Sequence, residues 1–432
     1  MQRTPAHAAP VLGIVSIALL AGCGTGGTSS PTSSASSGGG ALASCTGSVT
    51  VASDLPTSGS DASDGVPTQN GAKLAVTQAN ANKLLGGCTV NYLPMDDSSV
   101  ALGKHDPQQG AQNISALAGN PAVIGVVGPF NSNVAKAEMP TANRAGLVMI
   151  SPSNTGPGLT IVGSDPTTDT ASLRPTGKVT YFRVCTTDLQ QGHGLATAAT
   201  DTLKVTKAYV LDDQETYGKG LADQFVKFFG QGGGTVLKRQ SLPGNTKDFK
   251  TQLTEAKSLG ADLVFFGGTS SNGGGIIRAQ MTDVGLTAKF EGGDGIVDDE
   301  FFKEAGAAGD GSYGTIAAPD PTKLPSAAQF VKDYKAAYGT DPGAYSANAY
   351  DGMNILLTAA KKVITDNGGK LPTDSTKLRS SERDAVAGID YTGAIGHTTF
   401  DANGDTSNVL LTLKVGKSQM WMYDATIQEK AG

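Results

Sequence analysis

The sequence predicts an α/β protein made of two lobes, each built on a doubly wound parallel sheet. From residue 46 onward, short apolar runs typical of strands alternate with helix-like stretches that close at glycine. This spacing favours βαβ units and parallel sheets. The alternating series occurs twice, once before and once after about residue 185, and each series indicates one lobe.

The first series predicts a sheet flanked by helices between residues 48 and 150. The run Ala122-Val123-Ile124-Gly125-Val126-Val127 is apolar throughout, and runs of this kind argue against a chain that is disordered along its whole length. The expected strands are 48–52, 89–93, 122–127 and 147–150, and the expected helices are 68–85, 108–118 and 133–145.

The second series repeats the pattern and ends in a different way. In the segment 218–230, Leu221, Phe225, Phe228 and Phe229 fall on one helical face, as expected of a helix that packs on a sheet. The expected strands are 206–211, 234–240, 261–266 and 288–291, and the expected helices are 190–203, 217–229, 246–259 and 274–284. Two long helices, 325–338 and 343–363, and a closing strand pair, 409–415 and 419–423, follow.

The loops that follow the strands are the first place to look for a site, because ligands of open parallel sheets bind beyond the carboxyl ends of strands. These loops are rich in Ser, Thr, Asn, Asp and Gly, which suits a polar cleft but also suits ordinary turns. They are 53–68, 128–134, 151–157, 212–218, 267–275 and 292–298.

Composition excludes one class of partner and offers little support for catalysis. The 432 residues include 33 Lys plus Arg against 39 Asp plus Glu, a net charge of -6, whereas nucleic-acid binding favours a basic surplus. The four histidines form no H-x-x-x-H pattern, and no serine lies in G-x-S-x-G. We therefore expect no enzyme, no metal site and no cofactor.

Two motifs fail on context. Residues 309–314 satisfy G-x-G-x-x-G but follow a Gly/Ala loop rather than a strand. Residues 401–405 resemble the start of a calcium loop, yet Thr412 stands where the twelfth, acidic ligand is needed. A tight turn between strands is the preferred interpretation.

The N-terminus predicts export and anchoring. Val11–Leu20 is an apolar run too short to span a bilayer but long enough for a signal peptide. Leu20-Ala21-Gly22-Cys23 resembles the bacterial lipobox, in which the cysteine is lipidated. We expect a signal peptide over 1–22, a lipid on Cys23 and a flexible Gly/Ser tether over 23–44. The alternative is a plain secretory signal followed by a chance cysteine.

Export makes a disulfide plausible between two of the remaining cysteines. Cys45 and Cys88 each stand just before a strand-like run. If those strands are parallel neighbours, both cysteines lie at the same sheet edge and could form a bridge worth about 4 kcal/mol. The alternative is two free thiols. Cys185 is interpreted as a buried small hydrophobe.

Seven segments together resemble the branched-chain amino-acid (Leu/Ile/Val) binding family, the lipoprotein solute-binding proteins of ABC importers with the type I periplasmic-binding fold. They occur in family order between about residues 46 and 425. They are 126–132, 146–155, 181–183 with Asp188 and 191–192, 217–220, 262–268, 292–295 and 400–405.

The resemblance implies a set of ligand-binding residues in the loops after the strands. Ser132 resembles the hydroxyl that accepts the ligand carboxylate, and Ser153, through its backbone, and Thr155 lie where the family holds both head groups. Asp294 matches the carboxylate that pairs with the ammonium, with Asp188 as a possible second partner. The remaining implied residues are Tyr217, which closes over the ligand, and Thr269 or Ser270, which replaces an aromatic.

Each of these residues also has a purely structural interpretation. Ser132 and Thr155 could be helix N-caps, and Asp188 could cap the helix near 190–203. Tyr217 could pack against the helix it precedes, and Asp294 could be a turn residue.

The resemblance also implies a mechanism in which two lobes open and close about a hinge. Crossover strands near 183–188, 315–319 and 398–408 form the hinge between lobe 1 (45–185 with 318–405) and lobe 2 (186–317 with 406–432).

The loop 53–65 bears on the class of ligand. Because this loop lacks an aromatic side chain, we expect a small polar amino acid or a related amine or amide rather than an aliphatic ligand.

We expect a monomer, anchored by lipid at the outer face of the cell membrane, that delivers its ligand to an ABC permease. The alternatives are a receptor module of the same fold that signals to a membrane partner and an exported enzyme.

Overall fold

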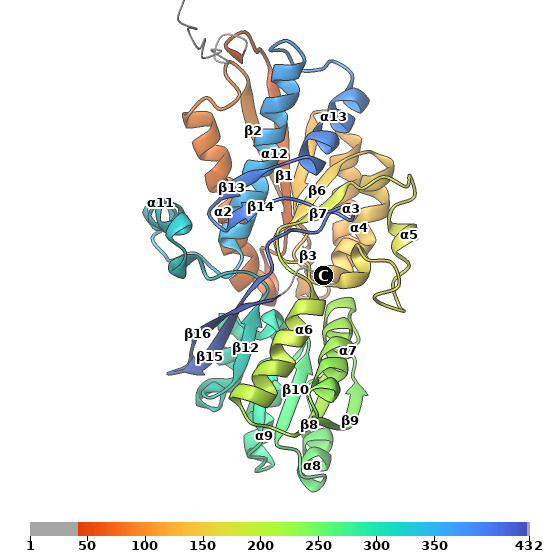
Figure 1. The fold of residues 1–432 in the computed structure, drawn as a ribbon, viewed down its shortest axis with the longest axis vertical. Helices are drawn as coiled ribbons and strands as arrows, with labels where there is room; N and C mark the ends of the chain where they lie inside the picture. The colour runs from red at the N-terminus through yellow and green to blue at the C-terminus, as the bar shows by residue number, and fades with distance from the viewer. Residues whose placement is uncertain (1–41, 430–432) are drawn as a thin grey trace, which may run out of the picture. The chain divides into compact units, whose positions relative to one another are not determined.

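The computed structural model of the chain describes residues 42–429, which form two parallel-sheet lobes (Figure 1). The predicted signal peptide, Cys23 and most of the predicted tether lie outside the described residues. The α/β class with two parallel-sheet lobes is confirmed. No helix within residues 42–429 is long and apolar enough to cross a membrane.

The first lobe has a five-stranded parallel sheet in the order β2-β1-β5-β6-β7. Its strands are β1 (Ser48–Leu55), β2 (Thr89–Asp96), β5 (Val123–Val127), β6 (Val148–Ser151) and β7 (Tyr181–Arg183). The helices that cover it are α2 (Ala62–Ala81), α3 (Pro107–Gly119), α4 (Ser132–Arg144), α12 (Ser346–Asp366) and α13 (Ser375–Ala387).

Alternation along the strands explains why this sheet is covered on both faces. In β5, Ile124 and Val127 pack in the core that includes α2 and α12, whereas Val123 and Val126 pack in the core beneath α3 and α4. Successive residues of a strand point to opposite faces, so a run that is apolar throughout buries both. The alternation shifts by one residue at Ile124, because Thr50 and Val51 of β1 pair with Val123 and Gly125 and leave Ile124 between them.

The second lobe has a seven-stranded sheet in the order β16-β15-β12-β11-β10-β8-β9. Its strands are β8 (Lys207–Asp212), β9 (Thr235–Ser241), β10 (Leu263–Gly267), β11 (Lys289–Gly292), β12 (Tyr313–Ile316), β15 (Leu410–Lys417) and β16 (Met420–Gln428). β15 and β16 join antiparallel, as the predicted closing pair requires.

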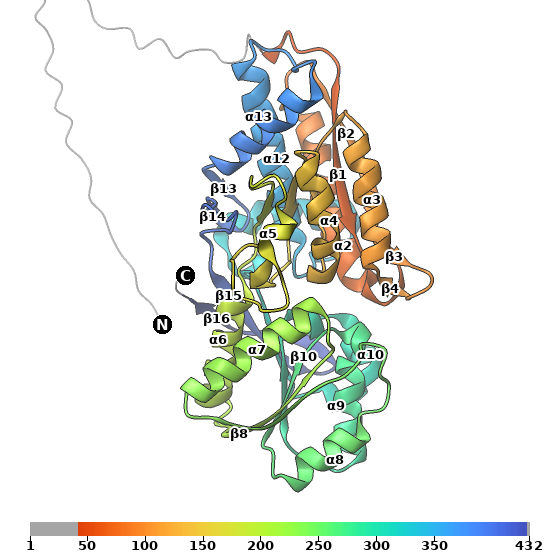
Figure 2. The ribbon, with the colours of Figure 1, turned by 90° about the vertical axis from the view of Figure 1, so that its right-hand side faces the viewer.

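Helices cover both faces of the second sheet. Figure 2 shows α7 (Thr216–Gln231) on one side and α8 (Lys250–Ser258) and α9 (Gly274–Asp283) on the other. Leu221, Phe225 and Phe229 of α7 are fully buried, as the helical face predicted. The face beneath α7 also receives α6 (Asp188–Thr197), and the opposite face receives α10 (Asp299–Ala305).

Several short elements were not predicted. A small hairpin, β3 (Ser98–Ser99) with β4 (Lys104–His105), follows β2, and a second, β13 (Tyr391–Gly393) with β14 (Gly396–Thr398), follows α13. Strands of two or three residues carry no readable alternation. α11 (Ala328–Tyr338) starts close to its predicted position, whereas α2 starts at Ala62 rather than at 68.

The chain passes between the lobes at three places, after β7, after β12 and after β14. The segment 156–178 after β6 is a surface excursion that is buried at its start. Residues 156–160 are buried, and the Arg183 guanidinium donates to the Gly156 carbonyl at 2.9 Å and to the Asn154 carbonyl at 3.0 Å. The rest of the excursion carries most of its exposed residues.

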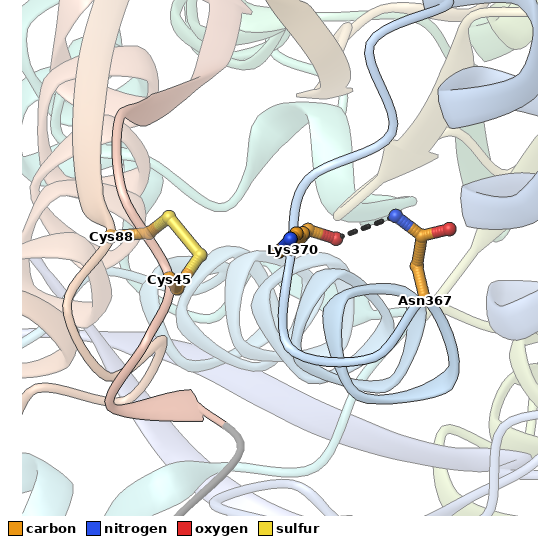
Figure 3. The surroundings of a disulfide bond; sticks show 4 residues. All are labelled: Cys45, Cys88, Asn367 and Lys370. Carbon is orange, nitrogen blue, oxygen red and sulfur yellow. Dashed lines mark hydrogen bonds between the residues drawn. A yellow bond between two sulfur atoms is a disulfide. The ribbon is translucent and has the colours of Figure 1, made fainter.

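The predicted disulfide between Cys45 and Cys88 is confirmed, with an S–S distance of 2.03 Å and a Cα–Cα distance of 5.1 Å (Figure 3). β1 and β2 are parallel neighbours in register from Ser48 and Thr89 onward, so the disulfide joins the chain just before the amino ends of both strands. Figure 3 also draws the turn after α12, where the Asn367 amide donates to the Lys370 carbonyl at 2.9 Å. The other cysteine among residues 42–429, Cys185, is free and buried, as predicted.

Candidate ligand-binding site

The loop after β5 leads into α4 and makes Ser132 the first residue of that helix. Gly128 has a φ of 135°, and a Cβ atom there would lie 2.2 Å from the Asp54 carbonyl oxygen, so this close approach requires glycine. Asn131 occupies the N-cap position, so the alternative of Ser132 as the cap is wrong. The buried Ser132 hydroxyl accepts the Gly156 N–H at 3.2 Å.

Ser153 and Thr155 lie in the buried loop after β6. The Ser153 hydroxyl donates to the Phe130 carbonyl at 2.9 Å, and the Ser153 N–H donates to the Ser151 hydroxyl at 3.3 Å. The Thr155 hydroxyl has no hydrogen-bond partner within residues 42–429. Thr155 does not cap the short helix that follows, since Gly156 holds that position.

Asp294 is the centre of a buried hydrogen-bond cluster that follows β11. One carboxylate oxygen accepts from the Gln191 amide at 2.9 Å and the Tyr217 hydroxyl at 2.8 Å, and the other accepts from the Tyr345 hydroxyl at 2.6 Å. Burial raises the pKa of Asp294, and these three donors partly oppose the rise. The carboxylate is therefore well oriented, with its negative charge favoured only by neutral donors.

Tyr345 connects this cluster to the other lobe. It immediately precedes α12 of the first lobe, and its hydroxyl accepts the Ala317 N–H at 3.1 Å while donating to Asp294. Its ring contacts the ring of Phe130 edge-on, with centroids 5.6 Å apart. The loop that carries Ser132 and the loop that carries Asp294 thus meet through one aromatic pair.

Asp188 is the first residue of α6 and is fully buried. Thr187 is the N-cap, its hydroxyl accepting the Leu189 N–H at 3.3 Å, so the capping interpretation of Asp188 is wrong. Neither carboxylate oxygen has a hydrogen-bond partner in the described part of the chain. Burial, and next the charge of Asp294, raise the pKa of Asp188 well above its usual value, while the nearby Thr155 hydroxyl lowers it.

Thr269 and Ser270 follow β10, and only Thr269 lies beside the Asp294 cluster. A Cβ atom on Gly295 would lie 3.1 Å from the Thr269 methyl group, and the Gly295 N–H donates to the Tyr217 hydroxyl at 3.0 Å. Ser270 is buried beside Asp298, where burial raises the pKa of that carboxyl to about 7 and the Ser270 hydroxyl lowers it. The structure thus gathers Thr155, Asp188, Tyr217, Thr269 and Asp294 and leaves Ser270 to one side.

A second set of polar contacts, the interlobe network, joins the β3–β4 hairpin to the second lobe. It consists of Lys104, His105 and Glu215: the Lys104 ammonium lies 2.6 Å from one Glu215 oxygen, and the His105 Nε2 lies 2.8 Å from the other. The Asn133 amide also donates to Glu215 at 3.0 Å, and Lys104 contacts the Asn272 side chain. Glu215 therefore receives three donors from the first lobe.

His105 is held as a cation inside this network. Burial opposes the charge, but Asp61, whose carboxylate lies 2.5 Å from Nδ1, and Glu215 raise the pKa of His105 to about 10. Burial likewise opposes the ionised forms of Asp61 and Glu215, yet His105 lowers the pKa of both, with help from Lys104 at Glu215.

Sequence reasoning missed Tyr345, Glu215 and His105. Gln191 stood in a motif that carried the family resemblance, but its role as a donor to Asp294 was not predicted. Tyr345 lies 51 residues from its partner Asp294 and belongs to the other lobe, so no local pattern could have identified it. One cavity of about 590 Å³ is lined by residues of β15, β16, the crossover after β12 and the loop before α12, and none of the eight predicted site residues lines it.

Comparison with protein families matches residues 48–419 to the periplasmic binding protein family. The Leu/Ile/Val-binding protein homolog 2 of Brucella abortus is 31% identical over 359 residues, 83% of this chain and 88% of that protein. The crystal structure of the leucine binding protein LivK from Thermotoga maritima has a TM-score of 0.74 at 25% identity, covering 88% of this chain and 98% of that one.

A second solved structure, the branched-chain amino-acid transporter substrate binding protein LivJ from Streptococcus pneumoniae in complex with isoleucine, has a TM-score of 0.73 at 25% identity. The two chains overlap over 88% of this chain and 98% of that one. The chain therefore belongs to the periplasmic binding protein family, whose members are exported solute-binding proteins of the type I fold rather than enzymes.

Proposed function

We propose that this protein captures a small amino-acid ligand between its lobes and delivers it to an ABC import permease. The lobes are residues 45–185 with 318–405 and residues 186–317 with 406–432. The names of the relatives support an amino-acid ligand, since the curated relative is a Leu/Ile/Val-binding homologue and one structural neighbour holds isoleucine.

The observation that carries the proposal is the pair of buried carboxyls Asp188 and Asp294 beside the Thr155 hydroxyl. Each carboxyl raises the free energy of the other's ionised form through charge repulsion, and neither has an ion-pair partner within residues 42–429. A ligand ammonium supplies the missing positive charge and hydrogen-bond donors. The Ser132 and Thr155 hydroxyls and the first N–H groups of α4 supply donors for a ligand carboxylate.

The surroundings favour a polar ligand side chain. Thr269 replaces an aromatic beside Tyr217, and Asp64 of α2 is close enough to Asp298 and Asp294 for their charges to raise its pKa, after the larger effect of burial. An aliphatic side chain would leave these polar groups desolvated without partners. We therefore propose a small polar amino acid, or a related amine or amide, as the ligand.

The same proposal includes a lipid on Cys23 and a tether up to residue 44, so that the monomeric binding fold stays at the outer face of the cell membrane. Mass spectrometry of the mature N-terminus tests this part independently of ligand binding. A mature chain that starts elsewhere, or that lacks the mass of a lipid, contradicts the anchor while leaving the ligand proposal intact.

Calorimetry on the purified chain, titrated with each of the twenty amino acids and with small amides and amines, tests the ligand proposal. We expect a polar ligand to bind and Asp294→Asn to weaken that binding by about 2–5 kcal/mol, because the substitution removes the charge that faces the ammonium. Asp390→Asn, at an exposed carboxyl paired with His397, is the matched control and should bind as the parent chain does.

Two outcomes contradict parts of this proposal. Tight binding of leucine without binding of polar amino acids contradicts the polar side-chain assignment. Unchanged affinity in Asp294→Asn removes Asp294 from the site.

A further inference from the structure

Three acidic side chains meet inside the first lobe, away from the Asp294 cluster. Asp54 is the second-last residue of β1, Asp97 directly follows β2, and Glu138 lies in the middle of α4. Each is fully buried, with 0% of its surface exposed. One oxygen from each carboxyl lies within 4.8 Å of the other two.

These carboxyls have very few donors. Both oxygens of Asp97, both oxygens of Glu138 and one oxygen of Asp54 have no hydrogen-bond partner within residues 42–429. The remaining Asp54 oxygen accepts from the Asn113 amide at 2.9 Å. No lysine, arginine or histidine in this part of the chain forms an ion pair with any of the three. Burying polar oxygens without partners is costly, so the group lacks a positively charged or donating component.

We propose that Asp54, Asp97 and Glu138 bind a divalent cation of the oxygen-preferring class, and we take Ca²⁺ as the candidate. Carboxylate oxygens are the ligands that such cations prefer. Two oxygens on one Ca²⁺ lie at most about 5 Å apart, because each bond is about 2.3–2.6 Å. The three oxygens lie within 4.8 Å of one another and so satisfy this limit, whereas Mg²⁺ would require every pair to lie within about 4.2 Å.

Protons are the competing explanation, and two other acids in the chain show the difference. Glu291 and Glu382 are fully buried with unpartnered oxygens in the described region, but each is alone, so a single proton makes each neutral. Burial raises the pKa of all three clustered carboxyls, and Asp54 raises the pKa of Asp97 and Glu138 further, whereas the neighbouring Glu138 carboxyl lowers that of Asp54. A divalent cation offsets two of the three negative charges in one binding event.

The location gives the cation a structural role. The Asp97 N–H donates to the Leu55 carbonyl at 3.3 Å, and the Asp97 carbonyl accepts the Asp106 N–H at 2.8 Å at the base of the β3–β4 hairpin. A cation held by Asp54, Asp97 and Glu138 therefore ties β1, this hairpin and α4 together. It acts on the element that carries Lys104 and His105 to the second lobe.

Titration of the chelator-treated chain with CaCl₂, in parallel with MgCl₂, tests the proposal at about pH 8, because the cation must displace the protons that these carboxyls hold and alkaline solution favours that exchange. We expect one Ca²⁺ per chain by calorimetry, weaker Mg²⁺ binding, and a rise in Tm of at least about 2 °C with saturating Ca²⁺. Asp97→Asn and Glu138→Gln should each weaken Ca²⁺ binding at least tenfold. Glu382→Gln, a lone buried carboxyl, is the matched control and should keep the parent affinity.

Each other outcome overturns the site. Absence of Ca²⁺ binding by the parent chain, with a higher Tm in Glu138→Gln, means that protons hold the cluster. Tighter binding of Mg²⁺ than of Ca²⁺ rejects the size argument, and affinity that survives both substitutions places the ion elsewhere. If the variants do not fold, the titration of the parent chain decides alone.

Discussion

Arg183 is the largest fully buried side chain of the described residues, and it shows how one charge organises the end of β7. Its guanidinium lies 2.6 Å from the Asp405 carboxylate, contacts the Thr160 hydroxyl and donates to two carbonyls of the segment after β6. Burial opposes this charge, but the Asp405 carboxylate keeps the pKa of Arg183 above its usual value. The start of the segment 156–178 is buried together with Arg183, whose guanidinium donates to the carbonyls and the hydroxyl of this segment.

We predict that Arg183→Met lowers the free energy of unfolding by about 3–5 kcal/mol, because it leaves Asp405 and several buried acceptors without their donor. Chemical denaturation monitored by circular dichroism measures the change. Lys335→Met is the control: Lys335 and Asp341 form a pair in which both side chains are exposed, and loss of an exposed pair costs about 0–1 kcal/mol. Equal effects of the two substitutions would contradict the role given to Arg183.

At the residue scale, the sequence predicted positions better than partners. Asp294 and Tyr217 were both placed in loops after strands, and the structure brings them to 2.8 Å. The sequence allowed Asp188 to be either a ligand-binding residue or a helix N-cap. The choice depends on whether Thr187 or Asp188 occupies the N-cap position, and the structure places Thr187 there. Glu138 is an ordinary polar residue of a helix in the sequence, because no local pattern indicates that its carboxyl lies close to that of Asp54 in the folded lobe.

The short β3–β4 hairpin supplies two of the side chains that connect the first lobe to the second. It has four residues in strands, yet it carries Lys104 and His105 to Glu215 of the second lobe. Its two strands are too short to show an alternation of apolar and polar residues, so the sequence did not predict the interlobe network. Most of the long helices and the paired strands were predicted because their apolar periodicity extends over many residues, whereas the long helix α13 was not predicted.

We predict that the interlobe network is most stable between about pH 5 and pH 6.5 and weakens progressively from there to about pH 10. The His105 pKa is raised to about 10 from its usual 6.5, so its contribution is complete below the usual value and is lost as the pH rises through about 10. The pKa values of Asp61 and Glu215 are lowered, so their contributions are present above about pH 4.5 and are lost as the pH falls further.

Small-angle scattering of the ligand-free chain from about pH 3 to about pH 10.5 checks the prediction, with a larger radius of gyration expected at both ends of this range. Glu215→Gln should remove most of the alkaline change, since it takes away one of the two carboxylates that hold the His105 proton. His397→Gln, at an exposed histidine, should leave the profile as it is. A profile that stays flat in the parent chain would refute a network controlled by His105.

At the scale of the whole molecule, the two sheets, their order of helices and the closing strand pair could be predicted because the βαβ pattern repeats twice. The contacts that hold the lobes against each other could not, since Tyr345 with Asp294 and Lys104 with Glu215 pair residues that are 51 and 111 apart in sequence. Such pairs depend on how two finished lobes meet, which no local pattern records.

The disulfide contributes to the stability of the first lobe as a unit. We predict that reduction, or the double variant Cys45→Ser with Cys88→Ser, lowers the free energy of unfolding by about 4 kcal/mol, because the sequence separation of 43 residues sets the loop entropy. Thermal unfolding with and without dithiothreitol measures the change. Reductant should have no further effect on the double variant, and an effect that persists there would point to Cys185 instead.

The disulfide also fixes which end of the first lobe faces a support. Cys45 and Cys88 stand at the amino ends of β1 and β2, whereas Ser132, Ser153 and the end of β1 mark the opposite edge, about 23 Å away along an eight-residue strand. A surface coupled directly at residue 42 therefore lies nearest to the edge farthest from these loops. Immobilised through its N-terminal side on an electrode or a sensor chip, the protein would present its ligand-binding loops to the solution without a reorienting linker.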